Sequence, residues 1–317
     1  MPGFTVRRLA LGDEASLAEY IRVRTAVTPE VPESIEQAHW EDSTYPGEVT
    51  RFLAEQDGRA LGTGSTGRIW MNRVDYPRYW LGMWVLADAR RRGIGTALYR
   101  ATSEVARAAG KTGFQTEVSE AWVDGVRFLA NRGFTITGRS KMVQLRLRDL
   151  TPPPVAPPAG LRLTTLEAEP HLVAGAHRVA VEAFPDIPTS DEPVEPGTLE
   201  AFINRDVDRA GVPRDAFMLA VDEATGEVAG YANLILRPGS TTVAYHDMTA
   251  VRPAFRGRGI AAALKRATIA WAIEHGLEAL ETGNDERNAP MRAINRKLGY
   301  TPLPDELDLQ GPLAPTP

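Results

Sequence analysis

The chain has 317 residues, a length that suits two domains better than one hydrophobic core. With 43% hydrophobic and 24% charged residues it has the composition of a globular protein, and its formal net charge of -5 gives no general attraction to nucleic acid or to an anionic membrane. The absence of cysteine excludes disulfides, thiolate metal sites and a cysteine nucleophile, and the five histidines show no metal-ligand spacing.

The amino-terminal residues are not those of a targeting segment. Residues 1–17, MPGFTVRRLALGDEASL, lack the apolar run of a secretory signal, and nowhere do about 18 apolar residues follow one another. Together with the lack of cysteine, this predicts a cytoplasmic protein that has no metal and neither a membrane nor a nucleic acid as partner.

The first half begins with a strand at Thr5 to Leu9, followed by polar helical stretches. A hairpin comes next, RFLAEQDGRALGTGSTG, in which Asp57-Gly58 supplies the turn chemistry. A strand that ends near Val85, a loop rich in glycine and arginine, a helix, an apolar strand and a short helix complete the half. The first half therefore alternates strands with helices.

A proline-rich segment follows the first half. Residues 151–160 read TPPPVAPPAG, and because proline fixes φ and removes a backbone donor, we expect an extended connector there. The predicted domains are therefore residues 1–150 and 161–317, joined by a linker at 151–160.

The second half repeats the order of the first. It has a strand at Leu161 to Leu166, a hairpin turn at Thr225-Gly226, and a helix from Ile260 to His275 that Gly276 ends. The repeat has a fixed offset, since 259 − 93 = 166 for the loop glycines, and residues 85–134 align without a gap to residues 251–300. We interpret this as a duplication.

The chemistry of the repeat lies in its loop, which reads VLADARRRGIGTAL in the first half and VRPAFRGRGIAAAL in the second. Glycine lets main-chain amides approach a ligand closely, and the helix that follows adds a partial positive charge at its first turn. Arginine side chains in both loops add charge, so a pyrophosphate is the expected ligand. A glycine used only for tight packing is the alternative for either loop alone. Neither a P-loop nor a dinucleotide-binding motif is present.

Both loops match the signature [RQ]-x-x-G-x-[GA] of the Gcn5-related N-acetyltransferase (GNAT) family, and most of both halves resembles its tandem subgroup, to which mycothiol synthase also belongs. The resemblance implies an α/β fold with a mixed sheet in each of two GNAT domains. The resemblance implies that acetyl-CoA is the co-substrate and that loop amides bind its pyrophosphate. The residues that it assigns to this site are Arg90, Arg91, Arg92, Gly93, Ile94 and Gly95 in the first half, and Arg256, Gly257, Arg258, Gly259, Ile260 and Ala261 in the second. The resemblance also implies that the pantetheine arm of acetyl-CoA lies beside the main chain of Met248, Thr249, Ala250 and Val251. Val85 is the first-half counterpart of Val251.

In the family the acceptor amine attacks the thioester directly, and a carboxylate on the fourth strand commonly removes its proton. In YHDMTAV this position resembles Asp247, whereas the first half has Leu81 there. A strand-end carboxylate and a contact to the substrate ammonium are the other interpretations of Asp247. His246 should point to the opposite face of the strand, as a core or surface residue.

Downstream, NAPMRAINRKLGY is similar to another family segment. Asn288 should cap a helix there and is a candidate cofactor contact. Asn295 stands where many members have a tyrosine general acid, and the first half has Leu129 at that position and Trp122 in place of Asn288. The first domain could therefore hold acyl-CoA without turnover, shape the acceptor site or act as a scaffold. For Trp80, Trp84 and Trp122, core packing is favoured over pocket lining.

The sequence thus predicts an N-acetyltransferase that moves acetyl from acetyl-CoA to the primary amine of a small molecule, with the second domain catalytic. The alternative is a noncatalytic acyl-CoA-binding or regulatory module, which the missing tyrosine favours. The segment from Ala183 to Pro196 is interpreted as loop decoration, with a cover over the acceptor site as the alternative.

Overall fold

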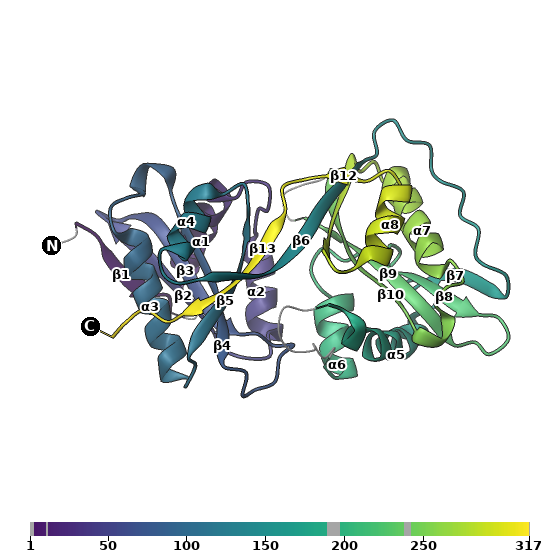
Figure 1. The fold of residues 1–317 in the computed structure, drawn as a ribbon, viewed down its shortest axis with the longest axis horizontal. Helices are drawn as coiled ribbons and strands as arrows, with labels where there is room; N and C mark the ends of the chain where they lie inside the picture. Colours follow the sequence, from purple (N-terminus) through teal and green to yellow (C-terminus); the bar gives the residue numbers. More distant parts are fainter. Residues whose placement is uncertain (1–2, 11, 189–196, 238–241, 317) are drawn as a thin grey trace. The chain divides into compact units, whose positions relative to one another are not determined.

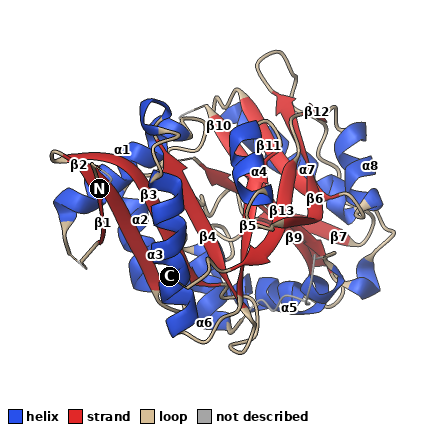
Figure 2. Ribbon diagram, turned by 60° about the vertical axis from the view of Figure 1, so that its left-hand side comes forward, coloured by secondary structure: helices blue, strands red, loops and turns tan. Residues whose placement is uncertain are grey.

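The computed structural model describes residues 3–10, 12–188, 197–237 and 242–316 (Figure 1). It divides the chain into two compact units, one comprising Met1–Arg139 with Glu306–Pro317 and the other Ser140–Asp305. Each unit is a mixed sheet with helices on its faces (Figure 2), so the predicted α/β class is confirmed. No helix in the described part of the chain has the length and apolar character that crossing a membrane would require.

The sheet of the first unit has the strand order β1-β2-β3-β4-β5-β13; within this order of described strands β4 and β5 run parallel and the other neighbours are antiparallel. Its elements are β1 (Thr5–Arg8), α1 (Glu14–Val27), α2 (Ile35–Thr44), β2 (Val49–Gln56), β3 (Arg59–Arg68), β4 (Arg78–Val85), η1 (Ala87–Ala89), α3 (Ile94–Ala108), β5 (Gly113–Ser119), α4 (Val123–Ala130), the beginning of β6 (Thr135–Arg146) and β13 (Glu306–Pro312). The predicted turn at Asp57-Gly58 joins β2 to β3 with positive φ at both residues.

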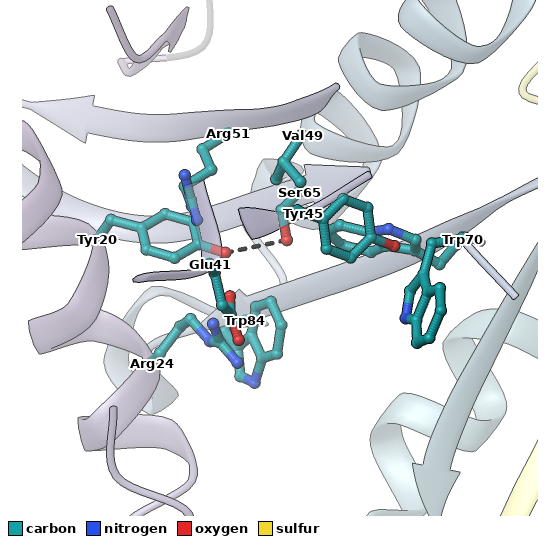
Figure 3. Close-up of a pocket in the computed structure, with 10 residues that line it drawn as sticks. Tyr20, Arg24, Glu41, Tyr45, Val49, Arg51, Ser65, Trp70 and Trp84 are labelled. Carbon is teal, nitrogen blue, oxygen red and sulfur yellow. Dashed lines mark hydrogen bonds between the residues drawn. The ribbon is translucent and has the colours of Figure 1, made fainter. Parts of the chain in front are cut away.

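Two helices cover opposite faces of the first sheet. Gly64 on β3 faces Leu98 of α3, while the next residue, Ser65, accepts a hydrogen bond of 2.9 Å from the Tyr20 hydroxyl of α1 (Figure 3). Because neighbouring residues of a strand point to opposite faces, α1 and α3 lie on different sides of β3. Leu98 and Ile94 of α3 are buried in the core on their side, and burial of such side chains contributes about 2 kcal/mol each.

The sheet of the second unit has the order β7-β8-β9-β10-β11-β6, with β12 also paired to β6, and only β10 and β11 run parallel. Its elements are β7 (Leu161–Thr165), η2 (Pro170–Leu172), α5 (Val173–Ala183), η3 (Phe184–Asp186), α6 (Leu199–Phe202), η4 (Ile203–Val207), β8 (Met218–Asp222), β9 (Val228–Leu236), β10 (Val243–Val251), η5 (Pro253–Phe255), α7 (Ile260–Glu274), β11 (Ala279–Asp285), α8 (Ala289–Lys297) and β12 (Thr301–Pro302). The predicted helix and its glycine stop are confirmed, since α7 ends just before Gly276, which has φ +73°.

The units do not divide the chain at the proline-rich segment. Residues 140–146 of β6 pair with β11 in the second unit, and β13, from the far end of the chain, pairs with β5 in the first. The division therefore falls inside β6, and residues 306–317 lie with the first unit instead of with 161–317. The physical reason is strand pairing: each sheet needs an antiparallel partner beside the second strand of its parallel pair, and a remote segment supplies it.

Candidate active site

The loop between β10 and α7 presents its main chain outward. Gly257 and Gly259 have φ of +77° and +82°, the left-handed conformation that glycine adopts without strain, and no atom lies within 4 Å of where a Cβ would be on either residue. Gly259 is the N-cap of α7, and the first intrahelical bond is donated by Ala263, so the preceding amides have no partner within the helix. Open space and unpaired amides at a helix N-terminus form a cradle for an anion.

Two arginines brace this loop. Arg256 donates from Nε to the Val251 carbonyl at 3.1 Å and pairs with Asp186 at 2.6 Å, while Arg258 donates to the Ala159 carbonyl at 3.2 Å. Each arginine side chain therefore already has a hydrogen-bond partner in the protein, and an anionic ligand would be an additional partner.

The loop of the first unit has the same backbone shape. Arg91 and Gly93 have φ of +62° and +88°, at the positions that correspond to Gly257 and Gly259, and Arg90 donates from Nε to the Val85 carbonyl at 3.2 Å. Arg91 takes the left-handed conformation without being glycine, which costs roughly 1 kcal/mol. Duplication has thus kept the geometry of the loop as well as its sequence.

The strands next to the two loops differ. In β10 the register against β9 shifts between His246 and Thr249, so Asp247 and Met248 lie in a β-bulge. The parallel pairing of β10 with β11 ends at Tyr245, and the main chain from Met248 onward makes no ladder with β11. In the first unit, every residue of β4 from Tyr79 to Val85 pairs with β3 in one unbroken register, so β4 has no bulge there.

Asp247 lies in a polar cluster on the side of the strand away from α7. Asn233 donates from Nδ2 to Asp247 at 3.2 Å, and its Oδ1 accepts from the Met248 amide at 3.2 Å. The residue keeps part of its surface accessible, yet loss of hydration raises the pKa of its carboxyl, against the lowering effects of Arg209 and of the Asn233 hydrogen bond.

A second carboxylate, Asp206, belongs to the same cluster and was not predicted. It lies in the π-helical turn η4, and burial together with the charge of Asp247 raises its pKa to about 7, although Arg209 and Arg205 act in the opposite direction. Turns of this kind are frequent at functional sites. No sequence motif marks Asp206, because its position depends on how η4 packs.

Tyr231 of β9 completes the cluster. Its side chain is fully buried, and its hydroxyl has no hydrogen-bond partner among the described residues. Burial and then the charges of Asp206 and Asp247 raise its pKa well above the ordinary value, so the hydroxyl stays a neutral donor. Tyr231 and Asn233 alternate on one face of the apolar run VAGYANLIL, a signal that the sequence contained.

His246 points the other way, as predicted, and is a core residue. It is buried, with Nδ1 3.3 Å from the Tyr300 hydroxyl and Nε2 3.3 Å from the Thr268 hydroxyl of α7. Burial, reinforced by Lys265, lowers the pKa of His246 far enough to keep the ring neutral. The same apolar setting lowers the pKa of Lys265 to about 7.

The downstream asparagines have structural partners. Asn288 caps α8 by accepting a hydrogen bond of 3.2 Å from the Met291 amide, which confirms the predicted cap. Asn295 is buried and donates a hydrogen bond to Asn284 at 2.6 Å. Because a carboxamide does not release a proton, Asn295 cannot act as general acid toward a leaving group.

In the first unit a cleft of about 1120 Å³ runs along the loop and between the diverging strands. Its walls include Arg90 and Gly93 of the loop and residues from β4, β5 and α4, since β4 and β5 pair only from Arg78 to Trp80. Trp80, Trp84 and Trp122 all line it, so pocket lining describes Trp80 and Trp122 better than core packing, whereas Trp84 lines the cleft and also packs against the core. Leu81, at the place of Asp247, is buried.

Two further predictions concern metal binding and the segment after α5. Among the residues that the structure describes, no group of three or more histidine and carboxylate side chains is placed to hold a metal ion. Of the segment from Ala183 to Pro196, residues 183–188 form the end of α5, η3 and a short connection, and residues 189–196 lie outside the described part.

Comparison with known proteins agrees with this geometry. The model of the Acetyltransferase (GNAT) family matches residues 17–134 and again 178–300. A mycothiol acetyltransferase of Mycolicibacterium gilvum is 31% identical over 80% of this chain and 82% of its own length; that of Mycolicibacterium vanbaalenii is 33% identical over 56% of this chain and 54% of its own.

Solved structures show the same fold. A tandem GNAT protein from the clavulanic acid biosynthesis pathway superposes with a TM-score of 0.78 at 21% identity, covering 99% of this chain and all of that one. A GCN5-related N-acetyltransferase from Sphaerobacter thermophilus gives 0.73 at 19% identity, covering 100% and 98%. The chain therefore belongs to the GNAT family of acetyltransferases, which use acyl-CoA, and carries two GNAT domains in tandem.

Proposed function

We propose that the second unit is the catalytic one and that it transfers acetyl from acetyl-CoA to the primary amine of a small molecule. The observation that carries the proposal is the cluster of Asp247, Asp206 and Tyr231 beside the β10 bulge, a few residues before the glycine loop. The first unit has the loop and lacks the cluster, because Leu81 is buried where Asp247 would be. That both curated relatives are named acetyltransferases supports acetyl as the transferred group.

The loop from Arg256 to Ala261 would bind the pyrophosphate. Its open left-handed glycines and its unpaired amides at the start of α7 fit an anion, and the braced arginines add positive charge nearby. The main chain from Met248 to Val251 follows the bulge, pairs with β9 on one side only and makes no ladder with β11, so the side toward β11 is where a pantetheine arm would bind. Asn288 is a further candidate contact, although its side chain already caps α8.

The carboxylates would receive the acceptor. An ammonium ion is attracted by two neighbouring carboxyls, and the hydroxyl oxygen of Tyr231 can accept a hydrogen bond from it. Only the neutral amine attacks, so its proton must leave, and a raised pKa makes Asp247 a better proton acceptor than an ordinary aspartate at neutral pH.

The reaction would then proceed without a covalent enzyme intermediate. The amine nitrogen forms a bond to the thioester carbonyl carbon, the carbon–sulfur bond breaks, and the nitrogen proton passes to Asp247, directly or through water. The departing thiolate takes a proton from solvent, because the side-chain amide of Asn295 is not an acid.

Replacing Asp247 by Asn tests this assignment. Coenzyme A release with a panel of small primary amines should fall by about 10²–10⁴-fold, with acetyl-CoA affinity within a factor of two of wild type. Asp208→Asn, an exposed carboxylate just after η4 that pairs with Arg214, is the matched control and should be neutral. Unchanged turnover in Asp247→Asn would contradict the base. Acetyl-CoA binding without turnover on any amine in wild type would instead favour the noncatalytic module.

A further inference from the structure

The parallel strands β10 and β11 lie in the middle of the second sheet and separate after one short ladder (Figure 2). Their last paired residues are Tyr245 and Glu281. Beyond this point β11 stays paired with β6 as far as Asp285, and β10 stays paired with β9 as far as Val251. Each strand is therefore held by its other neighbour, and we call the opening between β10 and β11 the fork.

Side chains satisfy main-chain groups at the base of the fork. The Thr282 hydroxyl donates to the His246 carbonyl at 2.9 Å, and the Gly283 amide donates to the Tyr245 hydroxyl at 3.2 Å. A parallel ladder would instead join each main-chain amide directly to a main-chain carbonyl. Because a side chain between two strands takes more room than a direct bond, both contacts keep β11 away from β10.

The two contacts lie on opposite faces of the sheet. The Thr282 side chain is only 2% exposed and shares its face of β11 with Leu280 of the core. The Tyr245 hydroxyl lies on the other face, 3.3 Å from where a Cβ of Gly283 would be. The base of the fork is therefore closed from both faces, and the main chain of residues 248–251 follows it without a ladder to β11.

The first unit has a fork with the same base. There β4 and β5 separate after Trp80 and Gln115. The next residue of β5, Thr116, donates from its hydroxyl to the carbonyl of the next residue of β4, Leu81, at 2.8 Å. Thr282 has the same place in the second unit. Since β4 has no bulge in its pairing with β3, the threonine bond is the feature that the two forks share.

In the proposed function the pyrophosphate lies at the loop before α7 and the pantetheine arm runs along residues 248–251. The thioester then lies near the base of the fork, close to Asp247. Further pairing of β10 with β11 would occupy the main-chain groups on the side where the arm binds. We propose that Thr282 is a positioning residue for acetyl transfer, whose hydroxyl holds the His246 carbonyl and so keeps the fork open for the arm. This inference rests on the proposed function of the second unit.

Two substitutions of Thr282 separate its hydroxyl from its shape. Thr282→Val keeps the shape and leaves the buried His246 carbonyl without its donor, so a main-chain amide of β11 is a ready replacement. The strands then pair further, and the arm has to part them before it binds. Thr282→Ser keeps the hydroxyl and should keep the fork.

Two ligands separate the fork from the loop: acetyl-CoA, and adenosine 3′-phosphate 5′-diphosphate, its nucleotide part, which keeps the pyrophosphate and lacks the arm. Each is titrated calorimetrically into the full chain carrying Gly93→Glu, so that the loop of the first unit contributes least. In this background Thr282→Val should weaken acetyl-CoA at least fivefold and leave the nucleotide within a factor of two. Thr282→Ser should restore the affinity for acetyl-CoA to within a factor of two.

Thr268→Val is the matched control, because Thr268 of α7 is also buried and has its hydroxyl 3.3 Å from the His246 ring, away from the fork. Both affinities should stay within a factor of two in this variant. Tyr245→Phe removes the acceptor of the Gly283 amide and should weaken acetyl-CoA selectively, even where Thr282→Val does not fold.

Unchanged acetyl-CoA affinity in Thr282→Val, or equal weakening of both ligands, would overturn the role of Thr282 and leave the proposed function intact. A complete loss of acetyl-CoA binding in Gly93→Glu alone would refute the proposed function of the second unit, and the role of Thr282 with it.

Discussion

At the scale of single residues, Asp247 and Asp206 illustrate what a sequence can and cannot indicate. Asp247 was assigned from the resemblance to the GNAT family, because it lies four residues before Val251 at the family's acidic position on the fourth strand, and its role as base stays a proposal. Asp206 could not be predicted, because its neighbourhood arises from the packing of η4 onto the sheet and from the bulge in β10. Core packing was favoured for Trp80, Trp84 and Trp122 because aromatic side chains usually pack there, whereas all three line the cleft that opens where β4 diverges from β5.

The raised pKa of Asp206 predicts how the free energy of unfolding depends on pH. Its folded pKa, about 7, is above its ordinary value of 3.8, so between these pH values the folded state binds a proton that the unfolded state has released. The free energy of unfolding must therefore decrease as pH rises from 3.8 to about 7. Asp206→Asn should remove that dependence and increase the free energy of unfolding by about 1 kcal/mol or more at pH 8, with no gain near pH 4.

Urea unfolding of wild type and Asp206→Asn at pH 4, 6 and 8 measures the effect. Asp208→Asn supplies the baseline for an exposed carboxylate. Equal effects of Asp206→Asn at all three pH values would show that Asp206 is an ordinary surface acid.

At the scale of elements, the features that depend on nearby residues in the sequence could be predicted. The hairpin turns, the helix α7 and its glycine stop follow from turn chemistry and apolar periodicity, both of which act within a few residues. The bulge in β10 did not follow, because a register shift is defined only against the partner strand β9. The same limit applies to the difference between β10 and the regular β4.

The cap of α8 provides a test at this scale. Asn288→Ala removes the acceptor of the Met291 amide and should lower the free energy of unfolding by about 1 kcal/mol, whereas Asn288→Asp keeps an acceptor and should restore it. Acetyl-CoA titration of both variants separates the two proposed roles. If Asn288 only caps the helix, affinity stays at the wild-type value in Asn288→Asp; a loss in both variants would indicate a direct contact.

At the scale of the whole molecule, the repeat at an offset of 166 residues was enough to predict two domains of one fold. The division of the chain was not predictable in the same way, because the strand that completes the first sheet comes from its last residues. Strand exchange of this kind leaves no local signal: β13 reads like any other short strand, and only pairing assigns it to β5.

Removing β13 should therefore damage the first unit. Leu307 and Leu309 are buried in its core, the Tyr99 hydroxyl donates to the Pro312 carbonyl at 2.5 Å, and the Ala314 amide donates to Ser103 at 2.9 Å. Burial of the two leucines alone contributes about 4 kcal/mol, which is a large part of the stability of a small domain.

A chain ending at Asp305 should show hydrogen exchange throughout α3 and β5 at rates close to those of the unfolded chain, with α7 and β10 still protected. A chain ending at Pro315 retains β13 and is the control. Full protection of β5 without β13 would mean that the first sheet is stable with an open edge.

The central claim is that the second unit performs the transfer, and turnover in matched loop variants tests it most directly. Gly259→Glu and Gly93→Glu place the same carboxylate at corresponding helix N-termini, where no atom lies within 4 Å of the new Cβ. Coenzyme A release at saturating acceptor should fall at least a hundredfold in Gly259→Glu and stay within threefold of wild type in Gly93→Glu. Loss of turnover in Gly93→Glu with activity retained in Gly259→Glu would contradict the account and move the catalytic site to the first unit.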